Sequence, residues 1–346
     1  MKLVRPILFA WFLLYGLNYT IYAQTSNLTI SNFFADTGIV QTTIITDIKK
    51  LRSTRNKPVW IPADIILKEN DTSAISENIS LRMRGHMRRS ICDNATLELN
   101  FKTQLSPRLS GLKKMKLVGG CRSSVFDEGL VLKEYLVYKM YNVLTPLSFK
   151  VRLLRITYID SKKKVGTYTQ YAFLVEDISD VANRNGYINK KTGIFRTEQT
   201  DRLHITFVSI FEYMIGNTDW SVTARHNIRL VVPKNDTLTK PFAIPYDFDY
   251  SGVVNAPYAV PNEEFTTIKN VRERLFRGFP RTMEELRPII KTYQEKKKEI
   301  LQVITNCYML SNREKKDMTK YVEDFYDIID KENGVKRNFS DNGRLF

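Results

Sequence analysis

Gly216-Asn-Thr-Asp219 and Pro245-Tyr-Asp-Phe-Asp249 are the most informative stretches of the sequence. Asp201 is a suitable N-cap for a helix whose apolar residues recur at helical spacing, and Gly216 is typical of the residue at which a helix ends. Two short runs of β-forming residues, Ile228–Val232 and Phe242–Ile244, fill the interval between the two stretches. The acidic residues are therefore predicted to follow a helix end and a pair of strands.

Four oxygen-bearing side chains in this region form an ordered set: Asp219, Asn227, Asp247 and Asp249. Phosphoryl transfer needs a carboxylate near the acceptor hydroxyl, and hard oxygen ligands for magnesium ions that bridge the phosphates. Protein kinases use an Asp, an Asn and a second Asp in this order. Asn227 follows Asp219 by eight residues, a longer spacing than in the kinase catalytic loop, so we expect an atypical site. Taken singly, each residue also fits an ordinary surface turn or helix cap.

The rest of the sequence alternates between regions rich in β-forming residues and regions with helical spacing. Before residue 101 and again between residues 151 and 175 the sequence is rich in β-formers. Helical spacing follows Ser124, which can cap a helix, and dominates after Asn270. Capping boxes begin two C-terminal helices at Thr282 and Ser311. These patterns predict an α+β protein with a β-rich N-terminal lobe and a helix-rich C-terminal lobe. The predicted strands are Thr42–Thr46, Val59–Pro62, Ile79–Arg84, Leu97–Phe101, Val151–Asp160 and Tyr168–Val175.

The N-terminus has the pattern of a secretory signal peptide. Lys2 and Arg5 precede an apolar run, and Ala23 provides a small residue before a cleavage point at Gln24. The alternative, an uncleaved membrane anchor, is disfavoured because the apolar run is shorter than the ~20 residues that span a bilayer. We therefore expect residues 1–23 to be removed, no stable membrane span afterwards, and a periplasmic, cell-surface or extracellular protein.

The chain is strongly basic, with a net charge of +16. Such a surface favours anionic partners, but no zinc-finger, RNP or similar motif accompanies the charge, so we expect no nucleic-acid partner. Three cysteines are too few for a disulfide scaffold. Cys92 and Cys121 are candidates for a disulfide closing a loop of about 30 residues, and Cys307 fits a buried helical position.

Six stretches, taken together and in order, resemble the spore coat protein H family of atypical secreted kinases. The resemblance covers roughly residues 75–255 and suggests four segments: a signal peptide at 1–23, a β-rich extension at 24–74, a kinase-like domain at 75–280 and a helical segment at 281–346. The stretches are Leu81-Arg-Met-Arg-Gly-His-Met-Arg-Arg89, Met115-Lys-Leu117, Leu132-Lys-Glu-Tyr-Leu136, Tyr171-Ala-Phe-Leu-Val-Glu176, Gly216-Asn-Thr-Asp219 and Pro245-Tyr-Asp-Phe-Asp249.

The resemblance implies a two-lobed kinase-like fold that binds ATP with Mg²⁺ or Mn²⁺ and phosphorylates Ser or Thr of exported proteins. By matching motif, Asp219 would be the catalytic acid of the loop and Asp247 the principal metal ligand, assisted by Asn227 and Asp249. Glu176 would lie near the nucleotide base. A tight basic turn containing Arg84, Gly85 and Arg88 would cover the phosphates.

One feature of the family is not securely placed. Family members usually carry a phosphate-binding lysine where this chain has Asn94-Ala95, and the nearest basic candidates are Lys102 and Lys116. Loss of that lysine would remove charge stabilisation of the transferring group. Two alternatives therefore stay open: a degenerate kinase-like protein that binds an anionic envelope polymer or other partner, and a hydrolase in which Asp219, Asp247 and Asp249 hold two metal ions around a water. Binding of ATP would distinguish a kinase from the hydrolase.

Overall fold

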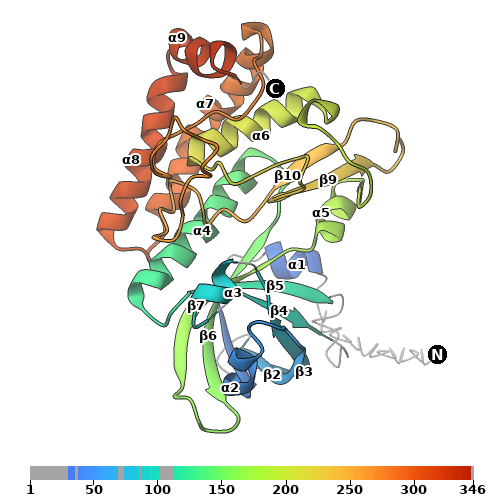
Figure 1. The fold of residues 1–346 in the computed structure, drawn as a ribbon, viewed down its shortest axis with the longest axis vertical. Helices are drawn as coiled ribbons and strands as arrows, with labels where there is room; N and C mark the ends of the chain where they lie inside the picture. The colour runs from blue at the N-terminus through green and yellow to red at the C-terminus, as the bar shows by residue number, and fades with distance from the viewer. Residues whose placement is uncertain are drawn as a thin grey trace, which may run out of the picture.

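The computed structural model describes residues 30–35, 38–68, 74–85, 87–94, 96–101 and 112–343. The predicted signal peptide and Lys102 lie outside these residues. A β-barrel forms one half of the molecule and a group of helices the other, as Figure 1 shows. The barrel strands are β1 (Val40–Thr46), β2 (Ile61–Lys68), β3 (Ala74–Met83), β4 (Leu97–Asn100), β5 (Lys114–Gly119), β6 (Val151–Asp160) and β7 (Tyr168–Val175).

Strand β1 closes the barrel. It pairs antiparallel with β2 on one side and parallel with β6 on the other, where Val40 lies opposite Leu154. Alternate residues of β1 and β2 are buried, so each strand contributes one apolar face to the interior. Ile44 and Ile65 are fully buried there. Closure leaves the strand order β1-β2-β3-β4-β5-β7-β6 without an open edge.

The expected two-lobed kinase-like fold is wrong. The chain does mix α and β structure, with strands before helices, but a closed seven-stranded barrel is not the open sheet of a kinase N-terminal lobe. The physical reason is the pairing of β1 with β6, which are more than a hundred residues apart in the chain. Strands β1 and β2, expected in a separate extension, thus share one barrel with β3 to β7.

Helix α4 (Val125–Leu144) joins the two halves. It packs on barrel strand β7 and on helix α7 (Met283–Thr305), and Figure 1 shows it crossing between them. Helices α6 (Arg202–Ile215) and α8 (Asn312–Ile329) complete the helical half. Its core is aromatic: the rings of Tyr141 and Phe211 lie 4.4 Å apart, and Tyr293 packs on Phe325.

A small sheet lies beside α6. Its strands run in the order β10 (Phe242–Pro245), β9 (Ile228–Pro233) and β8 (Tyr187–Asn189). The predicted strand pair between the two acidic stretches is therefore confirmed. Shorter helical elements are α1 (Ile30–Ala35), α2 (Ile48–Ser53), α3 (Met87–Ile91), α5 (Ile178–Arg184), α9 (Glu332–Val335), a 3₁₀ turn (Thr197–Gln199) and a π-helical turn (Lys336–Asp341).

The helix caps expected from the sequence are confirmed. Ser124 and Asp201 accept hydrogen bonds at the first turns of α4 and α6, and Thr282 and Ser311 form capping boxes. The predicted Cys92–Cys121 disulfide is also present. Within the described ranges, no helix combines the length and apolar character needed to cross a bilayer.

Candidate functional site

The loop that carries Asp219 is fixed at its start by Gly216. Gly216 ends α6 with φ of 66°, and a side chain there would collide with the hydroxyl of Tyr321. The next residue, Asn217, is 1% exposed, and its Oδ1 accepts the Asp219 backbone N–H at 3.0 Å. The C-terminal end of α6 therefore fixes the backbone position of Asp219.

Two neighbours hold the Asp219 carboxylate. Asn227 Nδ2 donates to Asp219 Oδ2 at 2.9 Å and to the Asp219 carbonyl at 2.7 Å. His226 Nε2 lies 2.9 Å from Asp219 Oδ1. Asn227 adopts a left-handed backbone with φ of 51°, which Asn tolerates better than most residues. The carboxylate remains about one-third exposed, at 36%, so a ligand can reach it.

Asn227 also connects Asp219 to the second acidic stretch. Its backbone carbonyl accepts the N–H of Tyr246 at 3.0 Å, immediately before Asp247. Asp247 has φ of 69°, and its N–H donates to the Tyr138 hydroxyl of α4 at 2.8 Å. The strand pair β9–β10 thus brings the chain back to Asn227, which lies between Asp219 and the turn that carries Asp247.

Three cations gather on the Asp247 side. Lys116 Nζ lies 4.2 Å from the centre of the Tyr246 ring, and Arg229 Cζ lies 4.7 Å from it. Burial, together with Arg84 and Arg229, lowers the pKa of Lys116 to about 7, although Asp247 and Asp177 oppose the change. The positive charges of Arg84, Lys116 and Arg229 therefore repel one another, and a bound anion would relieve this repulsion. We call these three residues the cationic cluster.

A buried acidic network lies behind Asp247, between α4 and the barrel. Glu134 of α4 faces Arg88 at 3.9 Å, and Asp249 accepts the Tyr258 hydroxyl at 3.0 Å. Burial, together with Asp247, raises the pKa of Asp249 to about 6 against the opposing effect of Arg88. Burial likewise raises the pKa of Glu134 well above its usual range, helped by Asp249 and Asp247. Mutual repulsion of carboxylates makes this a region where added positive charge would be favourable.

The predicted basic turn divides between these two groups. Arg84 belongs to the cationic cluster, whereas Arg88 donates to the Gly119 carbonyl and faces Glu134. Burial alone would lower the pKa of Arg88, but Tyr258, Asp249, Glu134 and Asp247 outweigh it and raise the pKa. Gly85 between them has φ of 84°, which explains the glycine.

Glu176 follows Val175, the residue of β7 that pairs with Lys116, and its carboxylate is bound in an ion pair. Its two carboxylate oxygens accept from Arg184 at 2.9 and 3.0 Å, and its Oε2 also accepts the N–H of Lys150. It therefore ties the end of β7 to α5 instead of facing Asp219 or Asp247. Sequence reasoning missed Glu134 and Arg229, because their roles depend on contacts between distant segments. Glu134 did fall within one of the quoted stretches.

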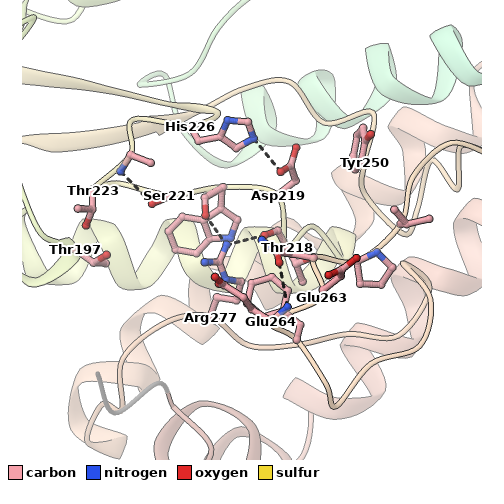
Figure 2. A pocket seen from close by; sticks show the side chains of 16 residues that line it. Thr197, Thr218, Asp219, Ser221, Thr223, His226, Tyr250, Glu263, Glu264 and Arg277 are labelled. Carbon is pink, nitrogen blue, oxygen red and sulfur yellow. Dashed lines mark hydrogen bonds and ion pairs between the residues drawn. The ribbon is translucent and has the colours of Figure 1, made fainter. Parts of the chain in front are cut away.

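An open pocket of about 740 Å³ lies on the Asp219 side. In Figure 2, Asp219 and His226 lie on one side of this pocket, and Glu263 and Glu264 lie on the opposite side. Arg277 at its wall donates to the carbonyls of Thr218 and Trp220, the two neighbours of Asp219. The Asp219 carboxylate is therefore accessible from this pocket.

A metal ion fits the chemistry of this region. Asp247, Asp249 and the amide oxygen of Asn227 are the hard oxygen donors that Mg²⁺ takes, and burial, with the nearby charge of Asp247, raises the pKa of Asp249. Among the described residues, no group of three or more His, Cys, Asp or Glu side chains is arranged to hold a metal by itself. Magnesium commonly completes its shell with phosphate oxygens and water, which such a group would not include.

Comparison with known proteins adds no assignment: no family model and no curated protein matches the chain.

Proposed function

We propose that the protein transfers the γ-phosphoryl group of ATP to a hydroxyl of an exported protein, as an atypical kinase whose site motifs resemble those of the spore coat protein H family. The observation that carries the proposal is the position of Asn227. Its side chain holds Asp219 beside the open pocket, and its backbone fixes the turn that presents Asp247 beside the cationic cluster. Asn227 thus positions two carboxylates, Asp219 on the acceptor side and Asp247 on the phosphate side. The proposal concerns this site and does not require a kinase fold.

The cationic cluster would bind the phosphates of ATP. Arg84, Lys116 and Arg229 supply three positive charges, and their mutual repulsion is relieved when a polyphosphate lies among them. Lys116 takes the role of the phosphate lysine in this proposal. Asp247 and Asn227, with Asp249 behind them, would hold Mg²⁺ or Mn²⁺. A metal ion held by these residues would supply positive charge that offsets the charge of the phosphates.

Asp219 would act as the general base. The acceptor hydroxyl enters through the pocket and attacks the γ-phosphorus, while its proton passes to the Asp219 carboxylate. The new bond joins the acceptor oxygen to phosphorus, and the bond to the β–γ bridging oxygen breaks, so the products are ADP and a phosphoester. His226 and Asn227 orient the carboxylate through the hydrogen bonds described above.

The two-metal hydrolase is less well supported. It would need Asp219, Asp247 and Asp249 to share ions around a water, yet Asp219 is held by His226 and Asn227, and Asp249 by Tyr258. The cationic cluster also has no part in that chemistry. We therefore do not propose it.

We further propose that the protein works outside the cytoplasm. The Cys92–Cys121 disulfide supports an oxidising compartment, since disulfides form and persist there. Cells are to be fractionated with free thiols trapped by alkylation. The proposal expects the protein in an exported fraction with only Cys307 alkylated; a protein found in the cytoplasm with three alkylated cysteines would refute it.

The proposed reaction is tested with labelled ATP, a divalent metal and a mixture of exported proteins from the source cells. Asp219→Asn keeps the size of the side chain but removes the base, so we expect transfer to fall by about 10²- to 10⁴-fold. Glu299→Gln, at an exposed carboxylate on α7, is the matched control and should leave transfer unchanged. Equal activity of wild type and Asp219→Asn would remove the assigned base.

A further inference from the structure

Glu212 is a buried carboxyl group that the proposed reaction does not use. It lies in the last turn of α6 and is 1% exposed. Its Oε2 accepts from Asn217 Nδ2 at 2.9 Å, whereas its Oε1 has no hydrogen-bond partner among the residues that the structure describes. A buried acid with one satisfied oxygen calls for an explanation, because an unpaired carboxylate is costly to bury.

Glu212 is connected to Asp219 through a single residue. The Asn217 side chain bonds Glu212 with its amide nitrogen and the Asp219 backbone N–H with its amide oxygen, at 2.9 and 3.0 Å. The Asn217 N–H also donates to the Glu212 carbonyl at 2.8 Å. Asn217 cannot turn without breaking a bond at one end or the other. The orientation of the Glu212 side chain therefore fixes the position of the Asp219 backbone N–H.

We propose that Glu212 is a positioning residue for Asp219, that it acts as a neutral carboxylic acid, and that its ionisation disables the site at alkaline pH. This inference rests on the proposed role of Asp219 as the base.

The surroundings of Glu212 favour the protonated form. Burial, with a smaller effect of Asp219, raises its pKa to about 8 against the opposing effects of the Asn217 hydrogen bond and Arg277. Tyr141 of α4 and Tyr293 of α7 also face it, and both are neutral phenols whose pKa is raised by burial. Since Oε2 already accepts from Asn217, the proton belongs on Oε1.

Ionisation would disturb both sides of Asp219. A buried carboxylate draws in water or a cation, and Arg277 is the cation that acts on Glu212. The Arg277 guanidinium is bound to the carbonyls of Thr218 and Trp220. A shift of Arg277 toward Glu212 would therefore move the two residues that flank the base.

The activity test compares wild type with Glu212→Gln, which keeps an acceptor for Asn217 but cannot ionise. With saturating ATP, wild-type kcat is expected to fall about tenfold between pH 7 and pH 9, one unit above the pKa, whereas the variant should change less than about twofold. Saturating ATP is used because bound phosphates raise the pKa of Lys116 and keep its charge. Parallel pH profiles for the two proteins would overturn the positioning role.

A second measurement needs no activity and separates this inference from the proposed reaction. Unfolded Glu212 ionises near its ordinary pKa of 4.5 and folded Glu212 near 8, so between these values only the folded protein keeps the proton. The stability that this group contributes is complete below the lower value and is lost as pH rises through the upper one. The melting temperature of Glu212→Gln minus that of wild type should therefore increase steadily from about pH 5 to about pH 8.

If that difference stays constant with pH, Glu212 is not a neutral acid and the inference fails, whatever the activity shows. Should Glu212→Gln fail to fold, difference infrared spectra of Glu134→Gln between pH 7 and pH 9 decide the matter. That variant removes the other buried carboxyl group whose pKa is raised well above its usual range, and Asp249, with a pKa of about 6, is already ionised at pH 7. Loss of one carboxylic-acid carbonyl band, with gain of a carboxylate band, is the expected result, and an unchanged spectrum contradicts it. If neither protein transfers phosphate at any pH, the proposed reaction fails while these measurements still report the state of Glu212.

Discussion

Lys116 illustrates how a residue acquires a role from its surroundings. It is an ordinary lysine in the sequence, but burial and two arginines lower its pKa to about 7. Folding therefore disfavours its charge, and the stability it contributes is present above its ordinary pKa of 10.5 and is lost as pH falls through 7. A bound polyphosphate reverses this balance because it supplies the missing negative charge.

The affinity for ATP should thus depend on pH through Lys116. Below about pH 7 the free protein already carries the charge, whereas above it ATP binding must take up a proton, so the dissociation constant should rise up to about tenfold per pH unit. Lys116→Met should weaken binding at pH 6 and flatten this dependence. Isothermal titration in two buffers of different ionisation enthalpy checks both the affinity and the proton uptake.

Lys114 provides the matched control, since it lies on the same strand and its Nζ faces the Trp60 ring instead of Tyr246. Lys114→Met should bind ATP as the wild type does. A pH-independent dissociation constant in the wild type would exclude Lys116 from the phosphate site.

At the scale of elements, the site depends on how α6 ends. Gly216 and Gly186 both have left-handed backbones, with φ of 66° and 79°. A Cβ at Gly186 would meet nothing within 4 Å, whereas one at Gly216 would collide with Tyr321. Alanine substitutions at these two glycines therefore separate the cost of backbone strain from the cost of a steric collision.

Gly186→Ala should cost about 1–2 kcal/mol, the usual penalty for an L-residue in this conformation. Gly216→Ala should cost distinctly more and should also reduce phosphoryl transfer, because Tyr321 must move and the start of the Asp219 loop moves with it. Denaturant unfolding gives the free energies. Similar losses for the two variants would mean that the contact with Tyr321 is unimportant.

Elements were the part of the structure that the sequence predicted best. The caps at Ser124, Asp201, Thr282 and Ser311 depend on hydrogen bonds within one helical turn, so local pattern is sufficient to find them. Strand β5 is different: it is short, and it gains its place by pairing with β4 and β7. Local sequence likewise does not decide whether Lys102 or Lys116 is the phosphate-binding lysine, because that role depends on how β5 pairs.

At the scale of the whole molecule, two long-range connections define the barrel half. The parallel pairing of β1 with β6 closes the barrel, and no local signal distinguishes that partner from an open edge. Resemblance in motifs therefore predicted a kinase-like fold, which the closed barrel contradicts. The ordered set Asp219, Asn227 and Asp247 does come together, because a short strand pair connects its members, whereas the Glu176 carboxylate is bound in an ion pair with Arg184.

The disulfide is the second connection. It links residues separated by 29 positions and joins the end of α3, which carries Arg88, to the segment after β5. The double variant Cys92→Ser, Cys121→Ser should lose about 3 kcal/mol of stability, the value expected for a loop of this length. Thermal unfolding with and without reductant checks this. The variant should be insensitive to reductant, and a wild type equally insensitive to it would contradict a stabilising disulfide.

Binding of Mg²⁺ and ATP to the purified protein tests the central claim most directly, because it needs no knowledge of the acceptor. Asp247→Asn is the informative variant, since Asn also tolerates the left-handed backbone that Asp247 adopts. We expect the wild-type melting temperature to rise with ATP and Mg²⁺ together, and Asp247→Asn to melt near the wild type without ligand but to show no such rise. A wild type that neither binds ATP nor changes its melting temperature with the metal and nucleotide would contradict the account.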